Sequence, residues 1–249
     1  MSSRSGSMAR VRASAVHLRD DIESQLFQAI VGVRTGDPFV AFTYDDGPTP
    51  GVTECIGSHL AERGHFATFF VLVDRAVAFP SLILDLVAQG HQIGLHGIGH
   101  QRMPLKSVRG LGRELRAGRT RLEDLVQEPV VFMRPPYGAQ SRTSFLVARS
   151  CGLKVVGWSV DPATYRAASA SDVAARLPRS VLRGAVVLLH DGDGEAPAGP
   201  LAEAREKVAV DSAEVITDWL SDRGLVSQTL GTLTARYPVS KARWIRGNK

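Results

Sequence analysis

The sequence contains only two cysteines among its 249 residues. Cys55 and Cys151 lie far apart along the chain, and neither belongs to a Cys-x-x-Cys pair. Two isolated cysteines cannot build a disulfide framework or a thiolate metal site, so both classes of protein are excluded. We expect two free thiols, both buried.

Long apolar runs are also missing. No segment approaches the roughly 18 apolar residues that a membrane-spanning helix needs. The Ser- and Arg-rich N-terminus lacks the apolar stretch of roughly 7–15 residues found in secretory signals. No internal repeat or low-complexity segment is visible. These absences predict a cytoplasmic chain without a membrane span, and they leave its oligomeric state open.

The body of the chain lacks excess positive charge, although the net charge of the whole is +5. Residues 1–19 and 241–249 each contain four basic residues and no acidic residue, which leaves −3 for residues 20–240. Nucleic-acid binding requires a basic surface on the folded body. We therefore expect no nucleic-acid partner and interpret the two ends as solvated basic segments.

Short apolar runs alternate with helix-like stretches along the body. Residues 107–127 and 211–223 carry apolar side chains at helical spacing, and residues 19–32 do the same and predict an extra leading helix. This alternation predicts an α/β fold with a parallel sheet, open or closed. The seven runs that predict its strands are 38–44, 66–73, 92–96, 130–133, 153–160, 184–190 and 225–230.

The length fits one domain, because α/β barrels commonly reach this size without a second core. We place a basic flexible segment at residues 1–18, the folded domain at 19–238 and a basic tail at 239–249.

Residues whose side chains can bind a metal or transfer a proton follow five of the apolar runs. Parallel strands present their functional groups at their carboxyl ends, so such residues are expected to meet at one edge of the sheet. Each has an ordinary explanation when taken singly, such as a turn, a solvated loop or a core histidine. All five strand ends would need such an explanation at the same time. We therefore interpret the residues together as an active site. The residues are Asp45, Asp46, His96, His100, Arg134, Asp161 and His190.

The spacing of these residues favours metal-assisted hydrolysis. His96 and His100 are four residues apart in a glycine-rich loop, so both can reach one ion. Two histidines and one carboxylate, with one position left for water, form a usual catalytic zinc site. An arginine such as Arg134, held by the prolines that follow it, can orient a neighbouring carboxylate.

In this order the motifs resemble those of the polysaccharide deacetylases of carbohydrate esterase family 4, which share the NodB homology domain. The resemblance extends from about residue 38 to about residue 235. It rests on five ordered segments: Tyr44-Asp45-Asp46-Gly47, His96-x-x-x-His100, Arg134-Pro135-Pro136-Tyr137, Asp161 and Leu189-His190-Asp191. The resemblance implies a distorted (β/α) barrel with about seven parallel strands.

The resemblance also implies roles for individual residues. Asp46, His96 and His100 would bind a divalent metal, most often zinc in this family. Asp45 would act as the general base toward the attacking water, and His190 as the general acid toward the leaving amine. The remaining implied roles are a backbone N–H that stabilises the oxyanion (Tyr137), orientation of the base (Arg134), tuning of either His190 or Arg134 (Asp161), and lining of the acetyl pocket (Leu189). Two aromatic residues are further candidates for the pocket: Tyr165, which replaces the usual tryptophan, and Trp158, whose place near a strand end allows stacking on a sugar as well as a core role.

This chain departs from the family pattern at several positions. Tyr44 stands where a phenylalanine is usual, and Leu95 stands where an asparagine is common. Two further changes lie in the metal loop and in the fourth motif. A serine or threonine usually follows the first metal histidine, whereas this chain has Gly97. The fourth motif usually reads Asp-x-x-Asp-Trp, whereas here Thr164 and Tyr165 follow Asp161-Pro162-Ala163. The first change removes a hydroxyl from the metal loop, and the second removes an acid beside His190.

Three hypotheses follow, in descending order. The first is a zinc-dependent hydrolase that removes N-acetyl groups from N-acetylglucosamine-containing oligo- or polysaccharides. The second keeps the site but assigns it to O-acetyl esters, non-sugar amides or cyclic imides. The third is a metal- or sugar-binding homologue with degraded catalysis.

Overall fold

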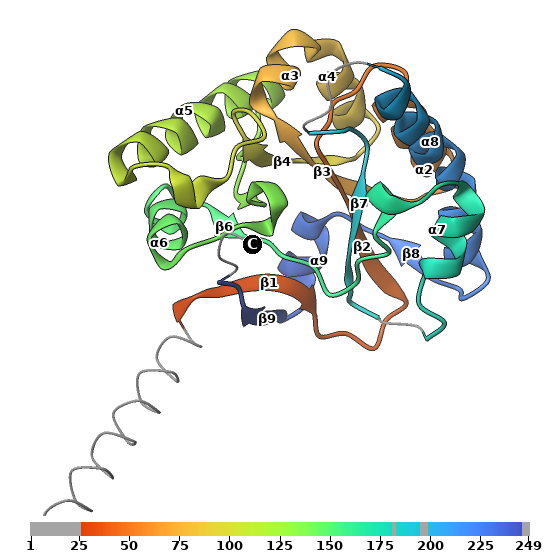
Figure 1. Ribbon diagram of the computed structural model, residues 1–249. Coiled ribbons are helices and arrows are strands. Elements are labelled where there is room, and N and C mark those ends of the chain that lie inside the picture. The colour runs from red at the N-terminus through yellow and green to blue at the C-terminus, as the bar shows by residue number, and fades with distance from the viewer. Residues whose placement is uncertain (1–25, 181–182, 195–198, 246–249) are drawn as a thin grey trace, which may run out of the picture.

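The computed structural model describes residues 26–180, 183–194 and 199–245 (Figure 1). The expected N-terminal segment at 1–18 lies outside these residues. So does the first half of the predicted leading helix, whose residues 19–25 are not described.

A curled parallel sheet forms the centre of the molecule. Its strands are hydrogen-bonded in the order β6-β5-β4-β3-β2-β7, and β8 pairs with the beginning of β2. Each of the seven predicted apolar runs overlaps one of these strands, so the predicted α/β barrel-like architecture is confirmed. Their bounds are β2 Phe39–Asp45, β3 Ala67–Leu72, β4 Gln92–Gly97, β5 Phe132–Met133, β6 Lys154–Val155, β7 Val186–His190 and β8 Val226–Ser227.

Helices surround the outside of the curled sheet (Figure 1). The longest predicted one, α5, begins after Ser107, whose side chain accepts a hydrogen bond from the backbone N–H of Gly110, and it ends at the left-handed Gln127. The α-helices are α2 Thr53–Glu62, α3 Val73–Ala78, α4 Pro80–Ala88, α5 Val108–Val126, α6 Arg142–Ser150, α7 Ala170–Arg176, α8 Pro200–Ser221 and α9 Leu230–Arg236. Three 3₁₀ turns follow strand ends: η1 Met103–Leu105, η2 Pro136–Gly138 and η3 Thr164–Arg166.

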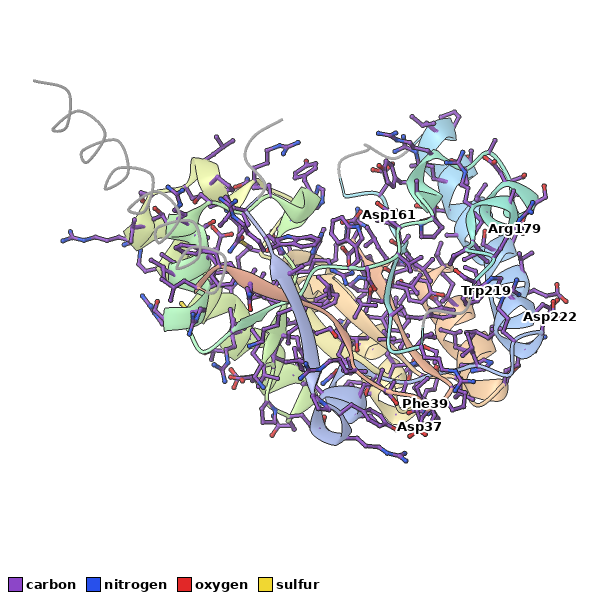
Figure 2. All side chains as sticks on the ribbon, turned by 90° about the horizontal axis from the view of Figure 1, so that it is seen from below. Asp37, Phe39, Asp161, Arg179, Trp219 and Asp222 are labelled. Carbon is purple, nitrogen blue, oxygen red and sulfur yellow. The ribbon has the colours of Figure 1, made fainter. Side chains whose placement is uncertain are left out.

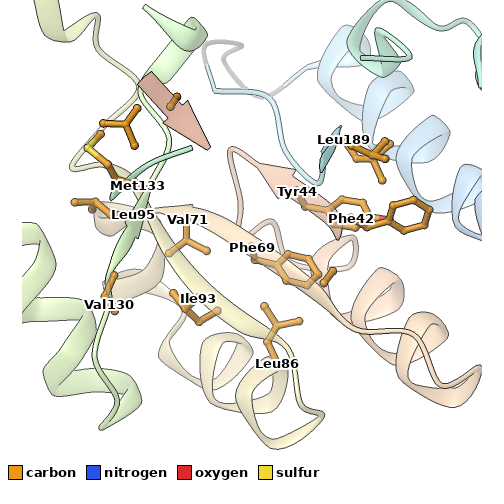
Figure 3. Packing of buried hydrophobic residues seen from close by; sticks show 14 of the residues in the cluster. Phe42, Tyr44, Phe69, Val71, Leu86, Ile93, Leu95, Val130, Met133 and Leu189 are labelled. Carbon is orange, nitrogen blue, oxygen red and sulfur yellow. The ribbon is translucent and has the colours of Figure 1, made fainter. Parts of the chain in front are cut away.

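The core lies on both faces of the sheet, because successive side chains of a strand point to opposite sides. Phe69 of β3 belongs to the large cluster under the surrounding helices, whereas its neighbour Phe70 belongs to a smaller cluster with β1 and α9. Figure 3 shows side chains from β2, β3 and β4 packed together in the large cluster. All six residues of β3 are buried, which explains its unbroken apolar sequence.

A two-stranded antiparallel ribbon lies across the open side of the sheet (Figure 1). It consists of β1 Gln28–Val33 and β9 Val239–Arg243. Isolated bridges join β1 to Val156, just after β6, and to Ala185, just before β7. The ribbon therefore links the two edge strands of the curled sheet.

This ribbon corrects two predictions. Residues 28–32 form a strand instead of the end of a leading helix, and residues 239–243 form a paired strand instead of a tail. A third correction concerns the cysteines, because Cys151 is buried and Cys55 is exposed. In the part of the chain described, no helix is both long and apolar enough to cross a membrane.

Candidate active site

The residues predicted from the strand ends surround one pocket of about 560 Å³. Asp45 ends β2 and His190 ends β7, and the two are in register on neighbouring strands. Figure 2 shows Asp161 well separated from Phe39, which begins β2, so the pocket lies at the carboxyl edge of the sheet. Ten of the eleven predicted site residues line it: Asp45, Asp46, His96, His100, Tyr137, Trp158, Asp161, Tyr165, Leu189 and His190.

Asp46, His96 and His100 converge on one point, and their ligand atoms all lie within 4.8 Å of one another. Oδ1 of Asp46 is 3.2 Å from Nε2 of each histidine. Two ligands about 2.1 Å from a tetrahedral zinc ion would be about 3.4 Å apart. The donor set and the spacing therefore fit a divalent metal ion.

The backbone fixes the orientation of these ligands. Nδ1 of His96 lies 2.8 Å from the carbonyl oxygen of Arg134, so this nitrogen donates and Nε2 remains available for a ligand bond. Gly97 has a φ of 119°, and a Cβ there would lie 3.1 Å from the carbonyl oxygen of Gly99. The glycine in the metal loop thus matches a conformation that a serine or threonine would adopt only with strain.

The charges at this point favour a cation. Burial opposes ionisation of Asp46, but the hydrogen bond from His96 and the charges of the surrounding histidines outweigh it and lower the pKa of Asp46 well below its usual value. Burial also opposes the charged form of His96, but Asp45 and Asp46 prevail and raise the pKa of His96. Both shifts show that this part of the pocket favours positive charge beside its carboxylates.

Asp45 is held by an arginine that is completely buried. One Nη of Arg134 donates to Oδ1 of Asp45 at 2.7 Å and to the hydroxyl of Thr43 at 2.7 Å. The other Nη donates to the carbonyl oxygen of Gly157 at 2.8 Å. The second carboxylate oxygen of Asp45 lies 4.0 Å from Nε2 of His96. One oxygen is thus occupied by Arg134, while the other lies beside His96, one of the three candidate ligands.

His190 is only partly buried, and its Nδ1 lies 3.1 Å from the hydroxyl of Thr164. The ring of Tyr165 packs edge-on against His190, with centroids 5.5 Å apart. Asp161 is exposed and accepts a hydrogen bond from the backbone N–H of Ala163. Burial lowers the pKa of Arg134, and the charge of Asp161 offsets a small part of this shift. The direct contact with His190 comes from Thr164.

Aromatic residues complete the pocket. The ring of Tyr137 lies 4.3 Å from that of His100, and the residue has a left-handed backbone with φ 60°. Trp158 packs edge-on against Trp244, which follows β9. Leu189, which precedes His190 in β7, is buried and still contributes to the wall of the pocket.

Three residues that contact the site were given no role from the sequence. Thr43 lies two residues before Asp45, so the alternation of side chains along a strand places both on the same face of β2. This spacing could have identified Thr43 from the sequence. Thr164 was noted only as a missing acid. Asp191 was noted only as part of a motif, yet it is fully buried behind the pocket and accepts hydrogen bonds from the N–H of Gly47 and the hydroxyl of Thr53. Burial, followed by the charges of the pocket carboxylates, raises the pKa of Asp191 to about 7 despite the bond from Thr53.

Comparison with known proteins gives consistent matches. The family model described as polysaccharide deacetylase matches residues 32–156, which include Asp45, Asp46, His96, His100 and Arg134 and end before His190. A chitooligosaccharide deacetylase of Sinorhizobium fredii is 33% identical over 198 residues, which are 79% of this chain and 92% of that protein. A peptidoglycan-N-acetylglucosamine deacetylase of Bacillus cereus is 30% identical, over 66% of this chain and 77% of that protein.

A solved structure shows the same architecture. The peptidoglycan N-acetylglucosamine deacetylase Bc1960, in complex with 4-naphthalen-1-yl-N-oxidanyl-benzamide, superposes with a TM-score of 0.73 and 26% identity. The match covers 82% of this chain and 91% of that one.

Proposed function

This chain belongs to the polysaccharide deacetylase family, and from that premise we propose that it removes N-acetyl groups from N-acetylglucosamine-containing oligo- or polysaccharides. The observation that carries the proposal is the arrangement around one pocket. Asp46, His96 and His100 converge beside the Arg134-bound Asp45, and His190 ends the adjacent strand.

Zinc is the proposed metal, because two imidazole nitrogens and one carboxylate are a usual zinc set. A divalent ion held there acidifies water and polarises the acetyl carbonyl. We assign its three ligands to Asp46, His96 and His100.

Asp45 acts as the general base in this proposal. Its oxygen nearest His96 takes the proton from the attacking water, while Arg134 holds the other oxygen and fixes the orientation of the carboxylate. The backbone N–H of Tyr137 stabilises the negative oxygen that develops on the acetyl carbon.

His190 acts as the general acid. An amide nitrogen leaves only when it is protonated, so a donor is needed beside the leaving group. Because Nδ1 of His190 faces Thr164, Nε2 is the nitrogen that donates. The hydroxyl of Thr164 donates to Nδ1 of the neutral ring and accepts from Nδ1–H of the charged ring, so it supports both states. Leu189, Trp158 and Tyr165 line the pocket around the acetylated sugar.

The test is acetate release from N-acetylated chito-oligosaccharides by the zinc-loaded protein. Asp45→Asn keeps the size of the side chain but removes the base, so turnover should fall by about 10²–10⁴-fold while zinc stays bound. Asp85→Asn on α4, which is not among the residues that line the pocket, is the matched control. Turnover by Asp45→Asn at the parental rate would contradict the assignment of the base.

One observation favours a second substrate class. His190 has a neutral hydroxyl as its partner where the family has an acid, and an ester needs less help from a general acid than an amide does. O-acetyl esters are therefore the second substrate to test. Zinc binding without turnover of amides or esters would favour a binding role.

A further inference from the structure

We propose that Asp191 is a positioning residue that holds the metal ligand Asp46 in place. This inference rests on the proposed metal site of the function above. Asp191 follows His190 in the sequence, but its side chain contacts the turn after β2 and not the pocket.

Asp191 contacts the chain on both sides of Asp46. Its backbone N–H donates to the carbonyl oxygen of Asp45 at 3.2 Å, and its Oδ1 accepts from the N–H of Gly47 at 3.1 Å. Its Oδ2 accepts from the hydroxyl of Thr53 at 2.6 Å. One buried residue directly after β7 thus fixes the peptide groups before and after the ligand.

Asp46 needs such support because its backbone is left-handed, with φ 81°. A non-glycine residue in this region costs on the order of 1 kcal/mol and persists when its surroundings impose it. Arg75 adds a further contact by donating to the carbonyl oxygen of Asp46 at 3.1 Å and to the carbonyl oxygen of Asp193 at 2.8 Å. The loop after β7 therefore holds the ligand turn through Asp191 and, indirectly, through Asp193.

The two loops are packed too closely to shift independently. A Cβ at Gly47 would lie 2.1 Å from Oδ2 of Asp191, and a Cβ at Gly192 would lie 2.9 Å from the carbonyl oxygen of Asp46. Because Oδ1 of Asp46 sits 3.2 Å from both histidine nitrogens, a small rotation of this turn would separate the three ligands.

The experiment measures zinc affinity of the full chain by competition with a chromophoric chelator, without substrate. Asp191→Ala removes both side-chain contacts, and we expect zinc affinity to fall by about 10–100-fold, as for other residues that orient metal ligands. Asp191→Asn keeps an acceptor for the N–H of Gly47, so its loss should be smaller, about 3–10-fold. This milder variant decides the question if Asp191→Ala does not fold.

Ser227→Ala is the matched control. Ser227 is equally buried and also links strands through hydrogen bonds, accepting from the N–H of Phe42 and donating to the carbonyl oxygen of Phe66. It should lower thermal stability but leave zinc affinity and the visible spectrum of the cobalt-loaded protein unchanged.

Two results would overturn the inference while the proposed function stands. In one, both Asp191 variants bind zinc within about twofold of the parent. In the other, Ser227→Ala weakens binding as much as Asp191→Ala does. A parent protein that binds neither zinc nor cobalt would overturn the proposed function and this inference together.

Discussion

On the side of the pocket formed by β2 and β4, nearly every polar group is buried and held by a second contact. Arg134 is fully buried, Asp45 and His96 are almost so, and each is fixed by the others. On the side formed by β7 and η3, His190 is partly exposed and is held by one hydroxyl, while Asp161 and Tyr165 face solvent. We call these the ligand wall (Asp45, Asp46, His96, His100 and Arg134) and the acid wall (His190, Thr164, Asp161 and Tyr165).

This difference indicates that the two walls tolerate change unequally. A buried charge whose partner is removed loses most of its compensation, whereas a partly exposed group can exchange its partner for water. The five residues of the ligand wall match the family pattern, although Gly97 beside His96 departs from it. In the acid wall, the fourth motif itself is substituted.

The largest expected effect is on the ligand wall. Arg134→Met would leave the carboxylate of Asp45 buried without its cation, and removal of one partner of a buried pair costs about 3–5 kcal/mol of unfolding free energy. Urea unfolding measures this loss. Arg176→Met, which breaks an exposed pair with Asp172, is the control and should leave stability unchanged. Equal losses in the two variants would remove the distinction between buried and exposed pairs.

The next largest effect is on catalysis and concerns the proposed proton donor of the acid wall. His190→Asn removes the proposed acid, so hydrolysis of an N-acetyl amide should fall by about 10²–10⁴-fold. An aryl acetate ester has a leaving group that needs no proton, so its hydrolysis should fall far less. The ratio of the two rates is the measurement. A parallel fall on both substrates would assign His190 a role other than proton donation.

A smaller effect concerns pH and the residue that connects the two walls. Asp191 has a pKa near 3.9 when unfolded and about 7 when folded, so the folded chain binds the extra proton between these values. Stability of the metal-free protein should therefore fall as pH rises through this window, by about 2 kcal/mol between pH 5 and 7. Asp191→Asn removes this contribution. The measurement is the free energy of unfolding of parent and variant as a function of pH. The same pH dependence in both proteins would contradict the raised pKa of Asp191.

The smallest effect is on the acid wall. Thr164→Val removes a hydrogen bond worth about 1 kcal/mol, so kcat for the amide should fall about fivefold with KM unchanged. Thr164→Ser restores the hydroxyl and should return kcat to within about twofold of the parent. A rise in KM alone, or no rescue by serine, would show that Thr164 acts through packing and not through His190.

The same contrast explains what the sequence predicts well. The strands of the sheet are buried on both faces, so each appears as a continuous apolar run, and all seven runs overlap a strand. Because the strands are parallel, the polar residues at their carboxyl ends meet at one edge of the sheet. Asp45 and His190 meet because their strands are neighbours, although 145 positions separate them in the sequence.

The ribbon is what local patterns miss. Ile22, Leu26 and Ile30 have helical spacing, yet residues 28–33 pair with 239–243 at the other end of the chain. β9 is mostly exposed and partly basic, so it carries no apolar signal, and backbone hydrogen bonds define it instead. Thr164 was missed for a related reason, because a hydroxyl that replaces an acid shows its contact only when η3 is folded beside β7.

Arg134 has a further consequence for how this site can change. Its side chain binds Asp45, while its carbonyl oxygen accepts a hydrogen bond from His96, so one residue positions both the proposed base and a proposed ligand. A displacement of the chain at the end of β5 would carry the two groups together and preserve their separation. For directed evolution, the relative placement of Asp45 and His96 is thus expected to change only as a unit, through Arg134. The residues of the acid wall can instead be varied one at a time.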